Sequence, residues 1–537
     1  MPRKAPARAS SVELVELRVL DGPNRFFTRP AVKLEFRGPE PGMAAEVAAS
    51  AGLAVRRLHV ALGMPAPRVT ARHSVDRRTE TISYPWRRRT ISQAIGAAAA
   101  RLARGVTSEE KELASLHAVA LGPLPALPRP SVPIVAVTGT NGKSTTTRLI
   151  AHIANGAGLR VGMTNSDGIY VEGRLVEPGD WTGFGGAGRI LSEPRLDLAV
   201  LETARGGILL RGIGYAANDV SVVTNISADH LGLQGIDTLD ELADVKAAIV
   251  RITKRDGWAV LNADDPRVWA MRRDTAAGWY PFSLGGMTPQ VEDALDRGGR
   301  AAVLDRGRLA LLGAGRRPAR LASAAELPVT FAGLSRYNVA NALAAAAACD
   351  ALGIPHARIT AGLRTFARDV EANPGRLNLF QRDGVLALVD FAHNEAGLAG
   401  LLDVARTLAE RQGGSVRVAF GTAGDRSDEI LHGLGVLAGR GADDLVICEK
   451  QHYLRGRDVD EMNAILRAGA QEGGYGAAIE ACPDELTALQ TLLDRARRGD
   501  LCAVMSHAQR AEIFAWLERS GFAPVTPEEV RTLVGTG

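Results

Sequence analysis

The first hundred residues show two different spacings of apolar positions. Apolar and polar residues alternate at 12–20 and 31–36, VELVELRVL and AVKLEF, on either side of the turn-rich DGPNRFFTRP, and this pattern predicts a pair of strands. Helical spacing follows at residues 43–63 and 91–104. The pattern therefore predicts a small α+β domain over residues 1–105.

Further along the chain, buried strands alternate with helices. The proline-rich LGPLPALPRPSVP predicts a linker over residues 106–131, and residues 132–373 then contain PIVAV, LDLAVLE, DVSVVTNI and WAVLN. Such nearly continuous apolar strands are typical of a parallel sheet with helices on both faces. The alternation restarts after NPGR with GVLALVD, VRVAFG, DDLVICE and DLCAVMS, which predicts a smaller Rossmann-like α/β domain over residues 374–537.

Composition narrows the functional classes. The chain has 537 residues, more than one core accommodates, and its 46% hydrophobic and 23% charged residues are typical of a soluble multidomain protein. A net charge of +4 gives no reason to expect a nucleic-acid or membrane partner. There is no secretory h-region, no apolar run near the ~18 residues of a membrane span, and no paired cysteine spacing, so we expect a cytoplasmic protein. The four cysteines, expected to be buried and apolar in role, are Cys349, Cys448, Cys482 and Cys502.

A glycine-rich turn between the first strand and helix of the middle domain predicts a phosphate cradle. In GTNGKST the glycines let backbone N–H groups approach phosphate oxygens, the lysine adds positive charge, and the hydroxyls suit Mg²⁺. The GxxGKS spacing is shorter than the usual Walker pattern, and a tight turn with an incidental lysine is the alternative. The predicted ATP-binding residues of the cradle are Gly139, Thr140, Asn141, Gly142, Lys143, Ser144 and Thr145.

Polar residues follow the next strands at the edge where the cradle is expected. Glu202 ends LDLAVLE, and a carboxylate there suits Mg²⁺, although a solvated glutamate is the simpler alternative. Asn225, Asp229 and His230 follow the third strand; a lone histidine is usually structural, but three polar residues near a phosphate cradle favour a binding role.

One lysine lies beside the apolar stripe of a predicted helix. TLDELADVKAAIVRIT has a capping-box pair, Thr238 and Glu241, and an apolar stripe flanked by Lys246. Partial burial would lower the pKa of Lys246 and increase its reactive neutral fraction, whereas an ordinary flanking lysine extends to water.

Ordered motifs over about 400 residues resemble the Mur ligase superfamily, ATP-dependent amide ligases that include folylpolyglutamate synthases. They are GTNGKST, Glu202, the DH pair at 229–230, Lys246, NADD, RYNVANALAAAA, PGR and DFAHN. DFAHN departs from the commonest wording at Phe391 and, after it, at Glu395, which bears on substrate fit.

The resemblance implies roles for individual residues. Lys143 and Ser144 would hold the ATP phosphates and Mg²⁺, Glu202 the same metal and His230 a second ion, while Lys246 matches a position that many members carbamylate so that it helps the metals. The remaining nucleotide contacts that the resemblance implies are Asn338 and Asn341 toward adenine, and Arg376 and Asp390 toward the phosphates and ribose.

A narrower resemblance is to the cyanophycin synthetase family. TNSDGIYVEGR, GDWTG and ETARGGILLRGIGY resemble its Mur-ligase half, and RVLDGPNRFFTRPAVKLEF and HVALGMPAP resemble its N-terminal domain. The ATP-grasp domain that stands between these parts in that family is absent, and the proline-rich segment joins them instead.

The motifs predict an ADP-forming ligase that joins an amine to the carboxylate of an amino acid or peptide through an acyl phosphate. The narrower resemblance suggests a basic amino acid such as arginine and an acidic side chain as substrates. One alternative is a non-catalytic nucleotide-binding subunit that partners a separate ATP-grasp protein through residues 12–105. Another is a generic P-loop ATPase or kinase, which explains the cradle but not the other motifs. The acid and amine, Lys246 carbamylation and any homo-oligomer remain open at this stage.

Overall fold

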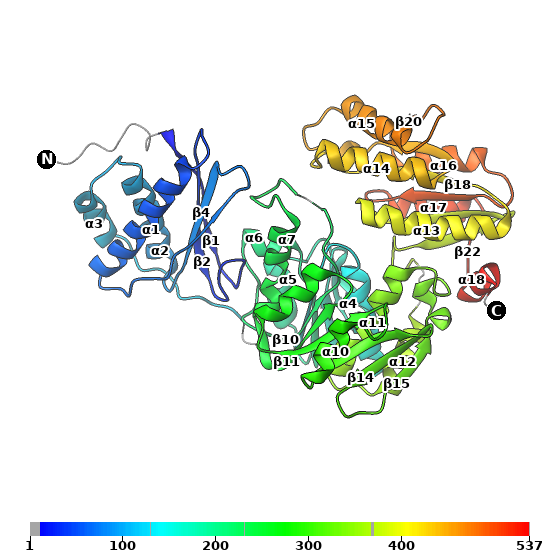
Figure 1. Cartoon of the computed structure of the whole chain (residues 1–537), viewed down its shortest axis with the longest axis horizontal. Helices are drawn as coiled ribbons and strands as arrows, with labels where there is room; N and C mark the ends of the chain where they lie inside the picture. The colour runs from blue at the N-terminus through cyan, green and yellow to red at the C-terminus, as the bar shows by residue number, and fades with distance from the viewer. Residues whose placement is uncertain (1–10, 129, 230, 367–369, 536–537) are drawn as a thin grey trace.

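The computed structural model describes residues 11–128, 130–229, 231–366 and 370–535, and it contains one sheet in each of three domains (Figure 1). The N-terminal sheet is antiparallel in the order β1-β2-β4-β3, and helices pack on one of its faces. Its elements are β1 (Glu13–Leu20), β2 (Ala31–Arg37), β3 (Thr70–His73), β4 (Thr79–Pro85), α1 (Met43–Ala61), α2 (Arg89–Ala103) and α3 (Glu109–His117). The predicted strand pair and both predicted helices are present.

The helix α3 lies inside the range predicted to be a linker, residues 106–131. Ser108 caps its first turn, and Glu112 accepts two hydrogen bonds from Arg101 of α2, at 2.7 and 2.9 Å. Leu116 is buried in the N-terminal core. The irregular connection to the middle domain is therefore shorter than predicted.

The middle sheet has the order β15-β14-β13-β12-β11-β10-β5-β9-β6-β7-β8. From β13 to β6 in this order the strands are parallel, as predicted, and an antiparallel hairpin extends each end. The strands are β5 (Ile134–Thr138), β6 (Val161–Thr164), β7 (Gly168–Val171), β8 (Arg174–Pro178), β9 (Leu198–Glu202), β10 (Asn218–Val223), β11 (Thr253–Asn262), β12 (Gly278–Ser283), β13 (Arg300–Asp305), β14 (Arg308–Gly313) and β15 (Ala319–Ser323).

Helices cover both faces of this sheet because the central strands carry apolar residues on both faces. Val135 and Val137 of β5 belong to the core beneath α4, α11 and α12, whereas Ile134 and Ala136 face the other helices. The helix predicted at 238–253 is divided into α7 and α8, and its capping box is confirmed. The helices are α4 (Lys143–Gly156), α5 (Phe184–Leu191), α6 (Arg205–Leu210), α7 (Leu239–Lys246), α8 (Ala248–Arg251), α9 (Pro266–Ala270), α10 (Pro289–Asp296), α11 (Arg336–Ala351) and α12 (His356–Thr365), with short turns η2 (Met271–Asp274), η3 (Ala324–Glu326) and η4 (Pro328–Thr330).

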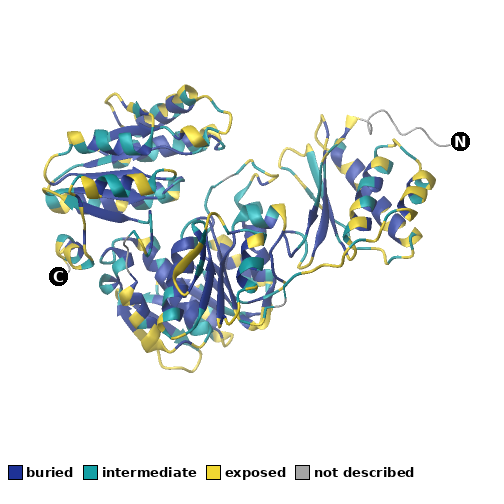
Figure 2. Cartoon of the chain, turned by 180° about the vertical axis from the view of Figure 1, so that it is seen from behind, coloured by how far each residue is buried: buried dark blue, intermediate teal, exposed yellow. Residues whose placement is uncertain are grey.

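The C-terminal sheet, in the order β20-β19-β18-β21-β17-β16-β22, is parallel from β20 to β17. Its strands are buried between two helical layers, α13, α14, α15 and α18 on one face and α16 and α17 on the other (Figure 2). The elements are β16 (Asn378–Arg382), β17 (Val385–Asp390), β18 (Val416–Phe420), β19 (Asp444–Cys448), β20 (Glu480–Cys482), β21 (Leu501–Met505), β22 (Ala523–Pro524), α13 (Glu395–Gln412), α14 (Asp428–Gly441), α15 (Val459–Glu472), α16 (Glu485–Arg495), α17 (Arg510–Arg519), α18 (Pro527–Val534) and η5 (Gln451–Tyr453).

The N-terminal domain is fixed to the middle domain by backbone hydrogen bonds. The Asp21 N–H donates to the Arg211 carbonyl at 2.8 Å, and the Ile213 N–H donates to the Pro23 carbonyl at 2.7 Å. Gly22 permits this approach, because a Cβ there would lie 1.8 Å from the Ile213 carbonyl oxygen. Residues 21–23 and 211–213 therefore lie side by side directly after α6.

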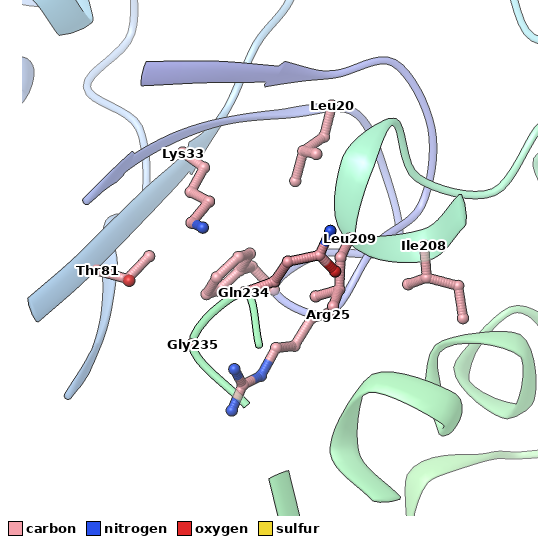
Figure 3. A pocket seen from close by; sticks show the side chains of 9 residues that line it. Leu20, Arg25, Lys33, Thr81, Ile208, Leu209, Gln234 and Gly235 are labelled. Carbon is pink, nitrogen blue, oxygen red and sulfur yellow. The ribbon is translucent and has the colours of Figure 1, made fainter. Parts of the chain in front are cut away.

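A small pocket lies beside this contact, between the N-terminal sheet, α6 and the 231–237 segment (Figure 3). Arg25, Lys33 and Gln234 contribute polar side chains, and Leu20 and Leu209 contribute apolar ones. Arg25 pairs with Asp244 at 2.9 Å and Lys33 pairs with Glu16 at 2.7 Å, so acidic partners offset both cations. None of the helices in the described residues is long and apolar enough to cross a membrane.

Candidate active site

The cradle, residues 139–145, connects β5 to α4 and is held against the end of β10. Gly139 and Gly142 have φ values of 146° and 84°, and a Cβ at Gly139 would lie 1.9 Å from the Thr224 hydroxyl oxygen. The Thr140 N–H donates to the Asn225 carbonyl at 2.9 Å, and the Asn141 N–H donates to the Asn225 side-chain oxygen at 2.9 Å. Asn225 thus fixes the backbone of the cradle, and the glycines are required by space as well as by conformation.

Two lysines bind carbonyl groups of the cradle. Lys143 donates from Nζ to the Thr140 carbonyl at 2.8 Å, and Lys246, at the end of α7, donates from Nζ to the Gly139 carbonyl at 2.7 Å. Lys246 is 4% exposed, and burial, together with the charge of Lys143, lowers its pKa to about 7. A large share of Lys246 is therefore neutral near pH 7 and nucleophilic.

Glu202 lies at the carboxyl end of β9, next to the cradle in the sheet. It is 3% exposed, and its Oε2 has no hydrogen-bond partner among the described residues. Burial raises its pKa, while Lys143 and Ser144 act in the opposite direction. A buried carboxylate oxygen without a partner, beside a serine hydroxyl, fits a hard cation such as Mg²⁺.

The rest of the predicted metal set is only partly placed. His230 lies outside the described residues, and within the part of the chain that the structure describes no group of three or more His, Cys, Asp or Glu side chains is arranged to hold a metal. Among the described residues, Glu202 and Ser144 would hold a cation there.

The C-terminal domain meets the cradle through the DFAHN segment. The Asn394 and Asn141 side-chain amides exchange two hydrogen bonds of 3.1 Å, and His393 lies 3.6 Å from the Asp229 carboxylate. Arg426, which follows β18, donates to the same carboxylate at 2.9 Å. Asp229 therefore faces the C-terminal domain, a partner that the sequence did not predict.

A second set of contacts crosses the same interface through Asp167. Its carboxylate accepts from Arg148 at 3.1 Å and from Arg510 of α17 at 2.7 Å, and despite burial these arginines and Arg376 hold its pKa below the usual range. Arg376 lies over the Phe391 ring at 4.4 Å. No local sequence pattern distinguishes Asp167, Arg148 or Arg510; for Arg426, the GDR turn after a parallel strand was the available signal.

Of the predicted nucleotide contacts, the asparagines of α11 lie next to the cradle, and Asp390 lies in the C-terminal domain. Asn338 and Asn341 are buried and joined by a 3.1 Å hydrogen bond on α11, and a Cβ on Gly142 would lie 2.3 Å from the Asn341 Oδ1. Asp390 accepts from the Leu377 and Ala392 N–H groups at 2.8 Å, and burial, partly offset by Arg376, raises its pKa to about 6. Asn341 therefore adjoins the cradle, and Asp390 braces the segment that enters from the C-terminal domain.

A small cavity adjoins Glu202 and is lined by residues of the middle domain. It is lined by Thr164, Thr182, Thr203 and Tyr215 in addition to Glu202. Gly207 permits the close approach of two backbone segments that line the cavity, since a Cβ there would lie 2.8 Å from the Gly183 Cα. The cavity offers several hydroxyl groups next to the buried carboxylate.

Comparisons with known proteins agree with this arrangement. The Mur ligase middle domain matches residues 137–349, and the Mur ligase glutamate ligase domain matches residues 375–508. Cyanophycin synthetase of Synechocystis sp. is 41% identical over 70% of this chain and 42% of its own length, so the chain spans less than half of that relative. UDP-N-acetylmuramyl-tripeptide synthetase of Deinococcus radiodurans is 31% identical over 70% of this chain and 72% of its own length.

The fold is shared with solved structures. A bifunctional folylpolyglutamate synthase/dihydrofolate synthase, solved with Mn, AMPPNP and L-glutamate bound, has a TM-score of 0.52 and 20% identity, and the match covers 73% of this chain and 90% of that one. Together, the domain matches and the sequence identities show that the chain belongs to the Mur ligase family.

Proposed function

We propose that the chain is an ATP-dependent ligase that joins an amine to the carboxylate of an amino acid or peptide, with ADP and phosphate as the other products. The observation that supports this most directly is the grouping of Lys143, Lys246 and Glu202, whose Oε2 has no hydrogen-bond partner among the described residues, around one cradle. A second domain contacts the same cradle through Asn394.

The chemistry requires activation of the acid, because a carboxylate does not react with an amine at neutral pH. The acid's oxygen attacks the γ-phosphorus of ATP, the bond to the bridging oxygen breaks, and ADP leaves from an acyl phosphate. The amine then attacks the acyl carbon, phosphate departs and the amine loses a proton. Each step places anions together, and positive charge at the cradle lowers that cost.

This chain's residues would bind the nucleotide, supply positive charge and exclude water. The cradle N–H groups and Lys143 would hold the phosphates, and Glu202 and Ser144 would hold Mg²⁺, which when bound offsets phosphate charge. The interdomain contacts of Asp229 and Asn394 would exclude water from the reactive acyl phosphate.

The relatives direct the choice of substrates to test. Because cyanophycin synthetase is among them, the first pair is a peptide with an acidic side chain and a basic amino acid such as arginine. Turnover with other acids, together with none with aspartyl peptides, would exclude that pair while leaving the ligase reaction intact.

An isotope experiment tests the reaction itself. Purified protein is given MgATP, arginine and an aspartyl peptide whose side-chain carboxylate carries ¹⁸O, and the released phosphate is examined by mass spectrometry. We expect one ¹⁸O to pass from the acid to phosphate, with amide product and ADP in equal amounts, and we expect Lys143→Ala to slow the formation of all three by about 10²- to 10³-fold.

Two outcomes would contradict the proposal. Binding of ATP without ADP or amide formation across a broad acid and amine panel would favour a non-catalytic nucleotide-binding subunit. A stable phosphorylated product in place of an amide would favour a kinase.

A further inference from the structure

Three loops of the C-terminal domain surround a buried ion pair that the proposed reaction does not use. The loops follow β17, β19 and β21, and because these strands are parallel, the loops meet at one edge of the sheet. Lys450, after β19, donates to the Glu485 carboxylate at 2.5 Å and to the Met505 carbonyl at 2.6 Å. Glu485 is 2% exposed, and Lys450 is buried as well.

The Glu485 carboxylate accepts hydrogen bonds from most of the loop after β21. The donors are the N–H groups of His507 at 2.8 Å, Ala508 at 3.2 Å and Gln509 at 3.1 Å, and the hydroxyl of Ser506 at 2.8 Å. Although burial opposes ionisation, Lys450 and these donors hold the pKa of Glu485 below its usual value. A charged acceptor that satisfies consecutive backbone donors fixes the path of this loop.

This loop carries two contacts toward the cradle. The Nε2 of His507 lies 2.6 Å from the Ala392 carbonyl, two residues before Asn394, whose side chain bonds Asn141 of the cradle. Arg510, at the start of α17, donates to Asp167 of the middle domain at 2.7 Å. Glu485 itself touches none of the middle-domain groups in these contacts.

We propose that Glu485 is a positioning residue for the interdomain active site, which holds the 506–510 loop so that the DFAHN segment and Arg510 meet the middle domain in register. The inference rests on the proposed function for its kinetic consequence only. The geometric consequence, a defined placement of the C-terminal domain over the cradle, is measurable without turnover.

The residue before β21, the strand that leads into the 506–510 loop, provides a matched control. Asp500, 4% exposed, precedes β21 at the opposite edge of the sheet and accepts from the Ser415 and Arg497 N–H groups and from Arg417 at 2.8 to 2.9 Å. It is a buried carboxylate with backbone and cationic donors, as Glu485 is, but it lies at the edge remote from the cradle. Asp500→Asn therefore reproduces the loss of local stability without the loss of positioning.

The experiment compares Glu485→Gln with Asp500→Asn in the full chain. Glutamine keeps the shape of the Glu485 side chain, but its amide NH₂ group replaces one carboxylate oxygen. The N–H and hydroxyl donors of the 506–509 loop therefore lose part of their acceptor. Spin labels at Asp296→Cys and Glu472→Cys, both exposed, report the distance between the middle and C-terminal domains, and the native cysteines are buried and less accessible to the label. Distance distributions are recorded with MgAMPPNP, alongside AMPPNP affinity and kcat.

We expect a narrow distribution for the parent and for Asp500→Asn, and a broad one for Glu485→Gln. We also expect kcat to fall about tenfold or more in Glu485→Gln with AMPPNP affinity changed less than threefold, because misplacement across a site costs rate more than binding. If Glu485→Gln does not fold, Lys450→Met with Glu485→Gln removes the uncompensated cation and is expected to give the same broadening.

A Glu485→Gln distribution as narrow as the parent's, or equal broadening in Asp500→Asn, would overturn the inference. A parent that never turns over contradicts the proposed function instead, and the distances still decide the role of Glu485.

Discussion

Replacing Lys246 by methionine should stabilise the middle domain more at pH 7 than at pH 9. In the folded chain the pKa of Lys246 is about 7, whereas an unfolded lysine has a value of about 10.4. The folded pKa is the lower one, so between these values the unfolded chain binds more protons, and stability rises as pH rises. The limiting slope is about 1.4 kcal/mol per pH unit. Because the folded lysine is half titrated near pH 7, the parent should gain about 2 kcal/mol between pH 7 and 9.

Methionine keeps much of the length of the side chain and does not titrate, so the variant should lack this gain. The measurement is urea unfolding at pH 7, 8 and 9 in metal-free buffer depleted of CO₂, followed by tryptophan fluorescence. Four of the six tryptophans, Trp181, Trp258, Trp269 and Trp279, lie in the middle domain. A difference between parent and variant that stays constant within about 0.5 kcal/mol over this range would show that burial does not depress the pKa of Lys246.

Three further changes test other parts of the molecule. Lys143→Ala should lower turnover by about 10²- to 10³-fold, measured as ADP release, and recovery by Lys143→Arg would show that charge alone suffices. Gly142→Ala should cost about 2 kcal/mol in urea unfolding and weaken AMPPNP binding, since φ is 84° and a Cβ would lie 2.3 Å from a buried amide oxygen; unchanged affinity would contradict a tight cradle. Gly22→Ala should make the N-terminal domain more sensitive to limited proteolysis, because its Cβ would lie 1.8 Å from a backbone carbonyl oxygen. Gly188→Ala, whose Cβ would have no atom within 4 Å, should not, and equal proteolysis of the two variants would contradict the role of Gly22 in the domain contact.

The sequence predicted those parts of the site that local patterns encode. The glycines of the cradle and Glu202 are recognisable because parallel strands present their carboxyl ends at one edge. The contact between Asp167 and Arg510 joins residues 343 positions apart, and it depends on how two separately folded domains are placed. No local periodicity encodes such a placement.

The failure to predict helix α3 has a different cause. Its sequence, EEKELASLH, is short and mostly polar, and it precedes a proline-rich stretch that obscured it. The Ser108 cap and the acidic first turn were the available signals.

The paired segments 21–23 and 211–213 determine how far this protein can be divided. A version that begins at the connection before β5 would retain the cradle but would leave the Ile213 N–H and the Arg211 carbonyl without their present partners. It would also leave Asp244 without its partner Arg25 and open the pocket that Leu209 lines. Residues 209–213 follow closely on the strand that ends in Glu202, so we expect removal of the N-terminal domain to reach the surroundings of that carboxylate. Comparisons of activity between relatives with and without this domain should therefore exchange the domain together with residues 205–215.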